Sequence, residues 1–255
     1  MSAPTTTALD TERMRHKLAA SFAGVDNWIF DLDNTLYPAH TDLFAQVDKK
    51  ITAFIADFLK VEWDEAYRVQ KAYYREYVTS LRGLMVRDGV DPHAFIDFVH
   101  DIDHSPLEPD PALGAALAIL PGRKFVLTNG SRKHAEDVTR ALGIDAHFEA
   151  MFGIVEAQFT PKPATAPYDT FVRDHDIDPK RAVMFEDMPR NLEVPKQLGM
   201  RTVLVVSKGD QSHEWRSSWE DEGRDGTHVD HVTDDLADFL VTLCDHLGFA
   251  LTDPA

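Results

Sequence analysis

Five short apolar segments limit this chain to a small set of folds. They are rich in Val, Ile and Phe, and none of them alternates cleanly with polar residues. A strand buried on one face alternates, whereas a strand inside a parallel sheet is buried on both faces and does not. We therefore expect a parallel sheet whose strands include residues 25–30, 124–127, 152–155, 182–185 and 202–206.

Helical patterns separate several of these strands, at residues 131–143, 164–176 and 188–200. Gly143 and Gly199 stand where the first and last of these helices would stop. Alternation of strand and helix predicts an α/β fold with right-handed crossovers. The expected core is a Rossmann-like, doubly wound parallel sheet.

One long region interrupts this alternation between the first and second predicted strands. Residues 40–108 have a helical pattern throughout, with single helices expected over 64–81 and 91–102. The first helix of the region should bury one face formed by Leu43, Val47, Ile51, Phe54 and Phe58.

The helical region divides the chain into parts. We expect an all-helical cap domain at 40–108, inserted into an α/β core of residues 21–39 and 109–255, with an N-terminal tail at 1–20. Because the cap would emerge at the end of the first strand, it should lie over the carboxyl edge of the sheet like a lid.

The chain is acidic, with 43 Asp plus Glu against 26 Lys plus Arg and a formal net charge of -17. A nucleic acid or an anionic membrane would be repelled, so we expect neither as a partner. Cys244 is the only cysteine, which excludes a disulfide framework and a zinc cluster. Without a long apolar stretch or a secretory h-region, the protein is expected to be cytoplasmic.

Two carboxylates follow the first apolar segment directly, in the stretch WIFDLDNTLYP. Asp31 and Asp33 are separated only by Leu32. Neighbouring carboxylates in a partly buried site repel one another, and each loses hydration. Stability alone does not account for this pair, so we expect a positive group between them.

Polar residues also follow the other predicted strands. The second strand leads into Thr128, Asn129 and Gly130, and the fourth into Glu186 and Asp187. Lys162 lies between two prolines in the intervening segment TPKPAT. Ligands of open parallel sheets bind beyond the carboxyl ends of the strands, so these side chains should meet at one rim.

This set of residue types suits phosphoryl transfer through a covalent intermediate. Mg²⁺ prefers carboxylate oxygens, which makes Asp31, Asp187 and Glu186 candidate ligands. Asp31 would attack phosphorus to form an aspartyl-phosphate, and Asp33 would protonate the leaving oxygen and later deprotonate the attacking water.

Two further groups would hold the phosphate. Thr128 and the backbone N–H groups of the turn through Asn129 and Gly130 would bind its oxygens at the start of a helix. Lys162 would neutralise charge on the nucleophile and on the transferred group.

The ordered motifs DLDNT, LTNGS, PKP and FEDMPRN resemble those of haloacid dehalogenase-like hydrolases, and the resemblance covers residues 25 to 206. It implies that Asp31 is the nucleophile, that Asp33 is the general acid and base, and that Thr128 and Lys162 bind and neutralise the phosphate. It also implies that Mg²⁺ is bound by Asp31, Asp187 and the backbone carbonyl of Asp33, with Glu186 bound directly or through water.

A finer resemblance concerns DLDNTLYP, SLRGLM and FEDMPRNL, which are similar to the pyrimidine 5'-nucleotidase branch. It implies substrates such as UMP and CMP, and it makes Arg82 a candidate contact to the substrate. Asn129 and Gly130 are the other candidate substrate-binding residues.

Other functions stay open. They are a broad-specificity or sugar phosphatase, a phosphomutase, and a non-catalytic binding module on the same fold. A dehalogenase is disfavoured because displacement of a halide needs no acid at Asp33. Taken singly, each motif is typical of a turn or a helix cap. Their joint order favours the catalytic interpretation.

Elsewhere the structural interpretation is preferred. Tyr67, Tyr74 and Tyr77 share a helix face, which core packing explains, although one or two of them could stack on a base. His93, His100 and His104 show no metal-binding pattern. The C-terminal region should form a long loop, a short edge strand and a closing helix. Trp215 and Trp219 in that loop are candidates for a contact between subunits. The protein is expected to be a monomer or a homodimer.

Overall fold

The computed structural model describes residues 18–207 and 222–249. In these residues six strands form one sheet in the order β3-β2-β1-β4-β5-β6, and every neighbouring pair is parallel. The strands are β1 (Asn27–Phe30), β2 (Arg123–Leu127), β3 (Ala150–Phe152), β4 (Ala182–Glu186), β5 (Arg201–Val205) and β6 (His231–Thr233). The predicted parallel α/β core is confirmed.

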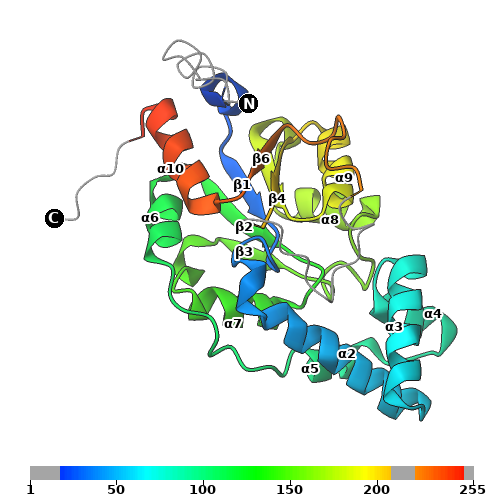
Figure 1. Ribbon diagram of the computed structural model, residues 1–255. Helices are drawn as coiled ribbons and strands as arrows, with labels where there is room; N and C mark the ends of the chain where they lie inside the picture. The colour runs from blue at the N-terminus through cyan, green and yellow to red at the C-terminus, as the bar shows by residue number, and fades with distance from the viewer. Residues whose placement is uncertain (1–17, 208–221, 250–255) are drawn as a thin grey trace, which may run out of the picture.

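Helices cover both faces of the sheet (Figure 1). On one face α6 (Pro111–Ile119), α7 (Arg132–Ala141) and α10 (Leu236–Leu247) pack on Trp28 and Phe30, and on the other α8 (Thr165–Asp174) and α9 (Glu193–Leu198) pack on Ile29. Successive residues of β1 thus enter opposite apolar clusters. This double burial explains why its sequence does not alternate.

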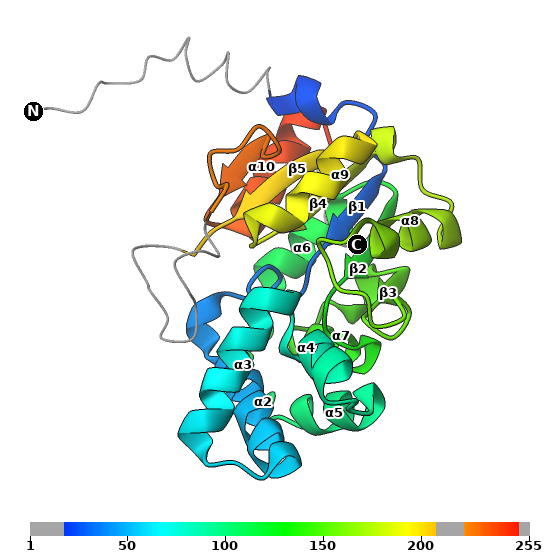
Figure 2. The ribbon, with the colours of Figure 1, turned by 90° about the vertical axis from the view of Figure 1, so that its right-hand side faces the viewer.

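The cap, defined here as helices α2–α5, lies between β1 and β2 in the chain. Its helices are α2 (Leu43–Leu59), α3 (Trp63–Tyr77), α4 (Ser80–Arg87) and α5 (Pro92–Val99), preceded by the 3-10 turn η1 (Ala39–Thr41). They enclose an apolar cluster of their own around Ile55, Ala66, Leu84 and Phe95. Figure 2 shows them gathered at one end of the molecule, below the sheet.

The predicted single helix over 64–81 is wrong. It breaks at Val78, whose φ of 74° is incompatible with helix, and α4 restarts at Ser80. Thr79 caps the new helix, since its Oγ1 accepts a hydrogen bond from the N–H of Arg82 at 3.1 Å. The break turns Thr79 and Ser80 toward the core.

The predicted buried face of α2 is only partly correct. Leu43 and Val47 are buried, but Phe58 is 40% exposed. Thr52 and Ile55 are buried in its place. Helix α2 packs against both α3 and α5, so the residues that it buries do not all lie on one face of the helix.

The third predicted strand, 152–155, is also misplaced. The chain leaves the sheet after Phe152, because Gly153 lies so close to the β2–α7 turn that a Cβ there would come within 2.7 Å of the Gly130 carbonyl oxygen. Ile154 then donates its N–H to that same oxygen at 2.8 Å and packs its side chain into the cap cluster. Its apolar character serves the cap and not the sheet.

The remaining elements are short. The predicted helix 188–200 divides into the 3-10 helix η4 (Pro189–Leu192) and α9, which ends at Gly199 with a φ of 98°. Two further 3-10 turns are η2 (Asp145–His147) and η3 (Pro179–Arg181). Helix α6 was not predicted as a separate element.

The predicted C-terminal edge strand and closing helix are confirmed as β6 and α10, and Cys244 is buried on α10. Trp215, Trp219 and most of the predicted N-terminal tail lie outside the described residues. Across 18–207 and 222–249, no helix combines the length and apolar character needed to cross a membrane.

Candidate active site

The central strands bring the predicted acids together. Asp31 follows β1, Glu186 ends β4, and Asp187 comes next. Strands β1 and β4 are neighbours, and the N–H of Asp31 donates to the carbonyl of Phe185 at 2.9 Å. The three carboxylates therefore lie side by side at the carboxyl ends of adjacent strands. All three residues are buried.

Lys162 lies at the centre of this group and is 1% exposed. Its Nζ donates to Asp31 Oδ1 at 2.7 Å, to Glu186 Oε2 at 2.7 Å and to the carbonyl of Leu127 at 2.8 Å. These three acceptors use all three protons of the ammonium group. Burial alone would lower the pKa of Lys162, but Asp31 and Glu186 raise it above its usual range, so the lysine is charged.

The carboxylates carry more negative charge than Lys162 balances. Burial, followed by repulsion from Glu186, raises the pKa of Asp31 to about 7, although Lys162 opposes the shift. Burial also raises the pKa of Glu186, with a contribution from Asp187. Such shifts indicate a site that needs additional positive charge.

Asp31, Glu186 and Asp187 have the chemistry of a site for a hard cation. One oxygen from each lies within 4.8 Å of the others, and together they form the only such group of three among the described residues. Carboxylate oxygens are the ligands that Mg²⁺ prefers. Glu186 is also engaged elsewhere, since its Oε1 accepts from Asn191 Nδ2 at 3.0 Å.

Asp33 has a separate set of partners. Its Oδ1 lies 2.5 Å from the hydroxyl of Tyr37 and 2.9 Å from Nε2 of His134. Burial disfavours its charge, but the charge and hydrogen bond of His134 and the hydrogen bond of Tyr37 outweigh burial and lower the pKa of Asp33. Burial and Asp33 raise the pKa of Tyr37 well above its usual value, so the phenol donates.

The turn after β2 is organised by its own side chains. Thr128 Oγ1 accepts the N–H of Gly130 at 2.9 Å. The amide of Asn129 forms two bonds with the backbone of Lys162: Oδ1 accepts the N–H at 2.8 Å, and Nδ2 donates to the carbonyl at 3.2 Å. Asn129 therefore fixes the backbone of the segment that carries Lys162. Its predicted contact with the substrate stays a prediction.

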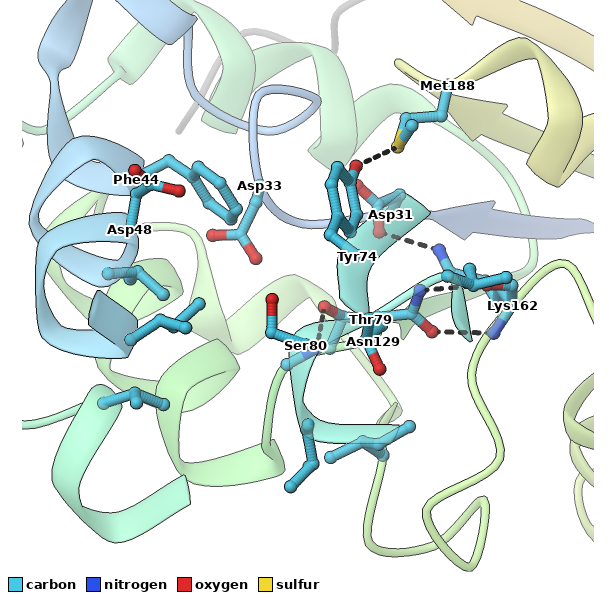
Figure 3. Close-up of a pocket in the computed structure, with 18 of the residues that line it drawn as sticks. Asp31, Asp33, Phe44, Asp48, Tyr74, Thr79, Ser80, Asn129, Lys162 and Met188 are labelled. Atoms are coloured by element: carbon cyan, nitrogen blue, oxygen red, sulfur yellow. Dashed lines mark hydrogen bonds and ion pairs between the residues drawn. The ribbon is translucent and has the colours of Figure 1, made fainter. Parts of the chain in front are cut away.

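A cavity of about 180 Å³ separates this rim from the cap. Figure 3 shows Phe44, Asp48, Tyr74 and Ser80 entering it from the cap, across from Asp31. The core thus supplies the acids and the cap supplies aromatic and polar side chains.

Tyr74 also joins the cap to the core. Its ring lies under the guanidinium of Arg190 at 5.5 Å from ring centroid to Cζ, and its hydroxyl lies 3.7 Å from the sulfur of Met188. Tyr74 therefore contacts core residues from the cap and is not packed inside an apolar core. Tyr67 is 39% exposed. That part of the tyrosine prediction is wrong.

The predicted site residues fall into two groups, those that line the cavity and one that does not. Asp31, Asp33, Thr128, Asn129, Gly130, Lys162, Glu186 and Asp187 all line the cavity. Arg82 lies on α4 and is not among the described residues of the cavity wall, so its substrate contact stays a prediction.

Sequence reasoning missed Tyr37 and His134, the partners of Asp33. Tyr37 lies four residues after Asp33, but His134 is 101 residues away. A histidine in the first turn of the helix after LTNGS was the only available signal, and it has no fixed spacing to Asp33.

Comparisons with known sequences and structures identify the family. A family model described as haloacid dehalogenase-like hydrolase matches residues 25–199. Phosphate metabolism protein 8 of Saccharomyces cerevisiae is 27% identical over 198 residues, which are 69% of this chain and 60% of that protein. The chain therefore spans less than two thirds of the length of this curated relative.

Two solved structures share the fold. CbbY from Rhodobacter sphaeroides, solved in complex with phosphate, has a TM-score of 0.56 and 20% identity, covering 86% of this chain and 99% of that one. A HAD phosphatase from Thermococcus onnurineus has a TM-score of 0.55 and 17% identity, with 89% and 100% covered.

In a parallel α/β sheet ligands bind beyond the carboxyl ends of the strands, which is where these acids lie. Since the family model matches most of the chain, the protein belongs to the haloacid dehalogenase-like hydrolases.

Proposed function

We propose that the protein is a Mg²⁺-dependent phosphomonoesterase that works through an aspartyl-phosphate on Asp31. The observation that carries this proposal is the contact of Lys162 Nζ with Asp31 at 2.7 Å, beside a second carboxylate, Asp33, that has separate hydrogen-bond partners. Lys162 thereby favours the charged form of one carboxylate, the nucleophile, and the other is available for proton transfer.

The reaction has two displacements. An oxygen of Asp31 forms a bond to phosphorus while the ester P–O bond breaks, and Asp33 passes to the departing oxygen a proton that it has taken up from the bound phosphate monoester monoanion. Water then forms a bond to phosphorus, its proton passes to Asp33, and the bond to Asp31 breaks. Lys162 and the turn after β2 balance the charge on the phosphoryl oxygens.

Asp31, Asp187 and the backbone carbonyl of Asp33 would hold Mg²⁺, with Glu186 directly or through water. When bound, the cation supplies charge stabilisation to the phosphoryl oxygens and orients them. The fit rests on the donor set and on the raised pKa values of Asp31 and Glu186, which reflect an excess of negative charge.

Mg²⁺ should raise the thermal stability of the folded protein, and more so at about pH 8 than at about pH 6. The raised pKa of Asp31, about 7, means that the metal-free folded state binds a proton there that the unfolded state has lost, so metal-free stability falls as pH rises toward 7. Below pH 7 protons compete with the cation. A near-saturating concentration should raise Tm by roughly 5–10 °C.

Differential scanning fluorimetry with Mg²⁺ and with EDTA measures this shift. Asp187→Asn should lose most of it, whereas Asp230→Asn, at an ion pair with Lys196 away from the cavity, should retain it. A shift that is equal in Asp187→Asn and wild type would place the cation elsewhere.

Asp33→Asn should lower kcat by about 10²–10⁴-fold, because both displacements lose their proton transfer. The change is nearly isosteric, and the carboxamide oxygen still accepts from Tyr37. Steady-state phosphate release measures the loss. Turnover within about threefold of wild type would remove Asp33 from the mechanism.

For the substrate, we propose a nucleoside 5'-monophosphate of the UMP or CMP type. The resemblance to pyrimidine 5'-nucleotidases supports it, and so does the cap wall of the cavity. Phe44 and Tyr74 offer flat apolar surfaces. Asp48 and Ser80 add polar atoms, although Asp48 Oδ1 already accepts from Gln70 and Lys71, and Ser80 Oγ already donates to the carbonyl of Gln70. That combination suits a base and a sugar carried together.

A panel of phosphate esters tests the proposal, assayed for phosphate release with Mg²⁺ and with EDTA. Release concentrated on UMP and CMP is expected. Release spread over sugar phosphates would retain the chemistry and replace the substrate class. Absence of release from every ester would overturn the phosphatase and favour a phosphomutase or a binding module.

A further inference from the structure

We propose that Tyr37 and His134 are positioning residues that hold Asp33 by Oδ1, so that Oδ2 is the oxygen that carries the transferred proton. This inference rests on the proposed function, in which Asp33 is the general acid and base. It assigns the task of selecting one oxygen to two residues outside the four motifs.

Both partners of Asp33 meet the same oxygen. The Tyr37 hydroxyl lies 2.5 Å and His134 Nε2 lies 2.9 Å from Oδ1. A carboxylate oxygen that accepts two hydrogen bonds has both lone-pair directions in use. A proton taken up by Asp33 therefore goes to Oδ2.

Oδ2 faces the expected reaction centre. An ideal Cβ on Gly130 would lie 3.7 Å from Oδ2 and 3.3 Å from Thr128 Oγ1. Oδ2 thus faces the turn that would bind the phosphate, and Figure 3 shows the Asp33 side chain entering the cavity.

The packing of His134 leaves its imidazole little freedom. Its side chain has no exposed surface, its backbone N–H donates to Ser131 Oγ at 3.1 Å, and its ring stacks on His100 at 4.6 Å between centroids. His100 follows α5 of the cap and is itself held by Ser131, with Nδ1 2.9 Å from Oγ. Core and cap together fix the ring.

The hydrogen bonding of His134 is directed at Asp33. Its Nδ1 is buried without a hydrogen-bond partner among the described residues, so Asp33 is the only partner that the described structure gives its ring. A buried polar group left half satisfied costs stability. A purely structural residue at this position would be better apolar, which indicates that the bond to Asp33 is what the imidazole provides.

The leaving group provides the test. An alkyl alcohol leaves as a strong base and needs the proton, whereas 4-nitrophenolate leaves without one. The specificity constant kcat/KM covers steps only through cleavage of the ester bond, so it reports acid catalysis separately from hydrolysis of the intermediate. Loss of acid positioning should therefore lower kcat/KM for the alkyl ester selectively, and structural damage should lower both.

Four variants are compared with wild type on 4-nitrophenyl phosphate and on an alkyl ester turned over in the panel. Tyr37→Phe and His134→Leu should lose roughly 10–100-fold in kcat/KM on the alkyl ester and less than about threefold on the aryl ester. His134→Gln, which keeps an N–H near the Nε2 position, should recover most of the loss. Asp33→Asn gives the upper limit of the selective effect.

Equal losses on both esters, or no loss on either, would overturn the positioning role and leave the proposed function intact. Failure of the wild-type protein to release phosphate from both esters would overturn the proposed function itself. Tyr37→Phe removes a single oxygen and keeps the ring, so it provides a readout even where His134→Leu does not fold.

Discussion

Replacing Asp31 by asparagine should abolish phosphate release, by about 10⁴-fold or more, and leave the protein folded. An amide oxygen at this position still accepts from Lys162, so the ion pair becomes a hydrogen bond. The change removes one of three crowded carboxylates, and it is a carboxylate whose pKa burial, followed by repulsion from Glu186, raises to about 7. We therefore expect no loss of Tm in the metal-free protein.

Steady-state phosphate release and a thermal melt measure the two quantities together. Asp26→Asn is the matched control, because Asp26 precedes β1 at the opposite edge of the sheet and pairs with Arg181. It should keep full activity. An Asp31→Asn protein with a wild-type kcat would remove the nucleophile from the mechanism.

Replacing Lys162 by methionine should affect both stability and rate. The substitution leaves Asp31 and Glu186 buried without their shared cation, and breaking a buried pair costs about 3–5 kcal/mol in the free energy of unfolding. The rate should fall by about 10²–10³-fold, because charge on the transferred phosphoryl group is no longer balanced.

Urea denaturation of the single and double variants separates these effects. Adding Glu186→Gln to Lys162→Met should restore part of the lost stability without restoring the rate. Lys60→Met is the control, since Lys60 is 76% exposed in its pair with Asp57 and should change little. If Lys162→Met were as stable as wild type, the buried ion pairs would not be the structural centre of the site.

The strand-end acids were predictable because the carboxyl ends of neighbouring parallel strands lie at the same edge of the sheet. Asp31, Thr128 and Glu186 come from three adjacent strands, so recognising the strands was sufficient to bring them together. Lys162 lies in a loop, and its place could be predicted only from the order of the motifs.

The misses have a common physical origin. Val78, with a φ of 74°, breaks a helix that periodicity continues, and Ile154 leaves a strand that its apolar character favours and packs in the cap cluster instead. His134 meets Asp33 across 101 residues of chain. Contacts between segments that are distant in the chain have no fixed spacing in sequence.

The covalent intermediate is the central claim, and trapping it is the most direct test. The protein would be mixed with a turned-over ester and Mg²⁺, quenched in acid within a turnover, and analysed by peptide mass spectrometry. A phosphoryl group on the peptide containing Asp31, and absent in Asp31→Asn, is the predicted result. Active wild-type protein that carries no phosphoryl group under conditions where hydrolysis of the intermediate is rate-limiting, or carries it on another residue, would contradict the mechanism.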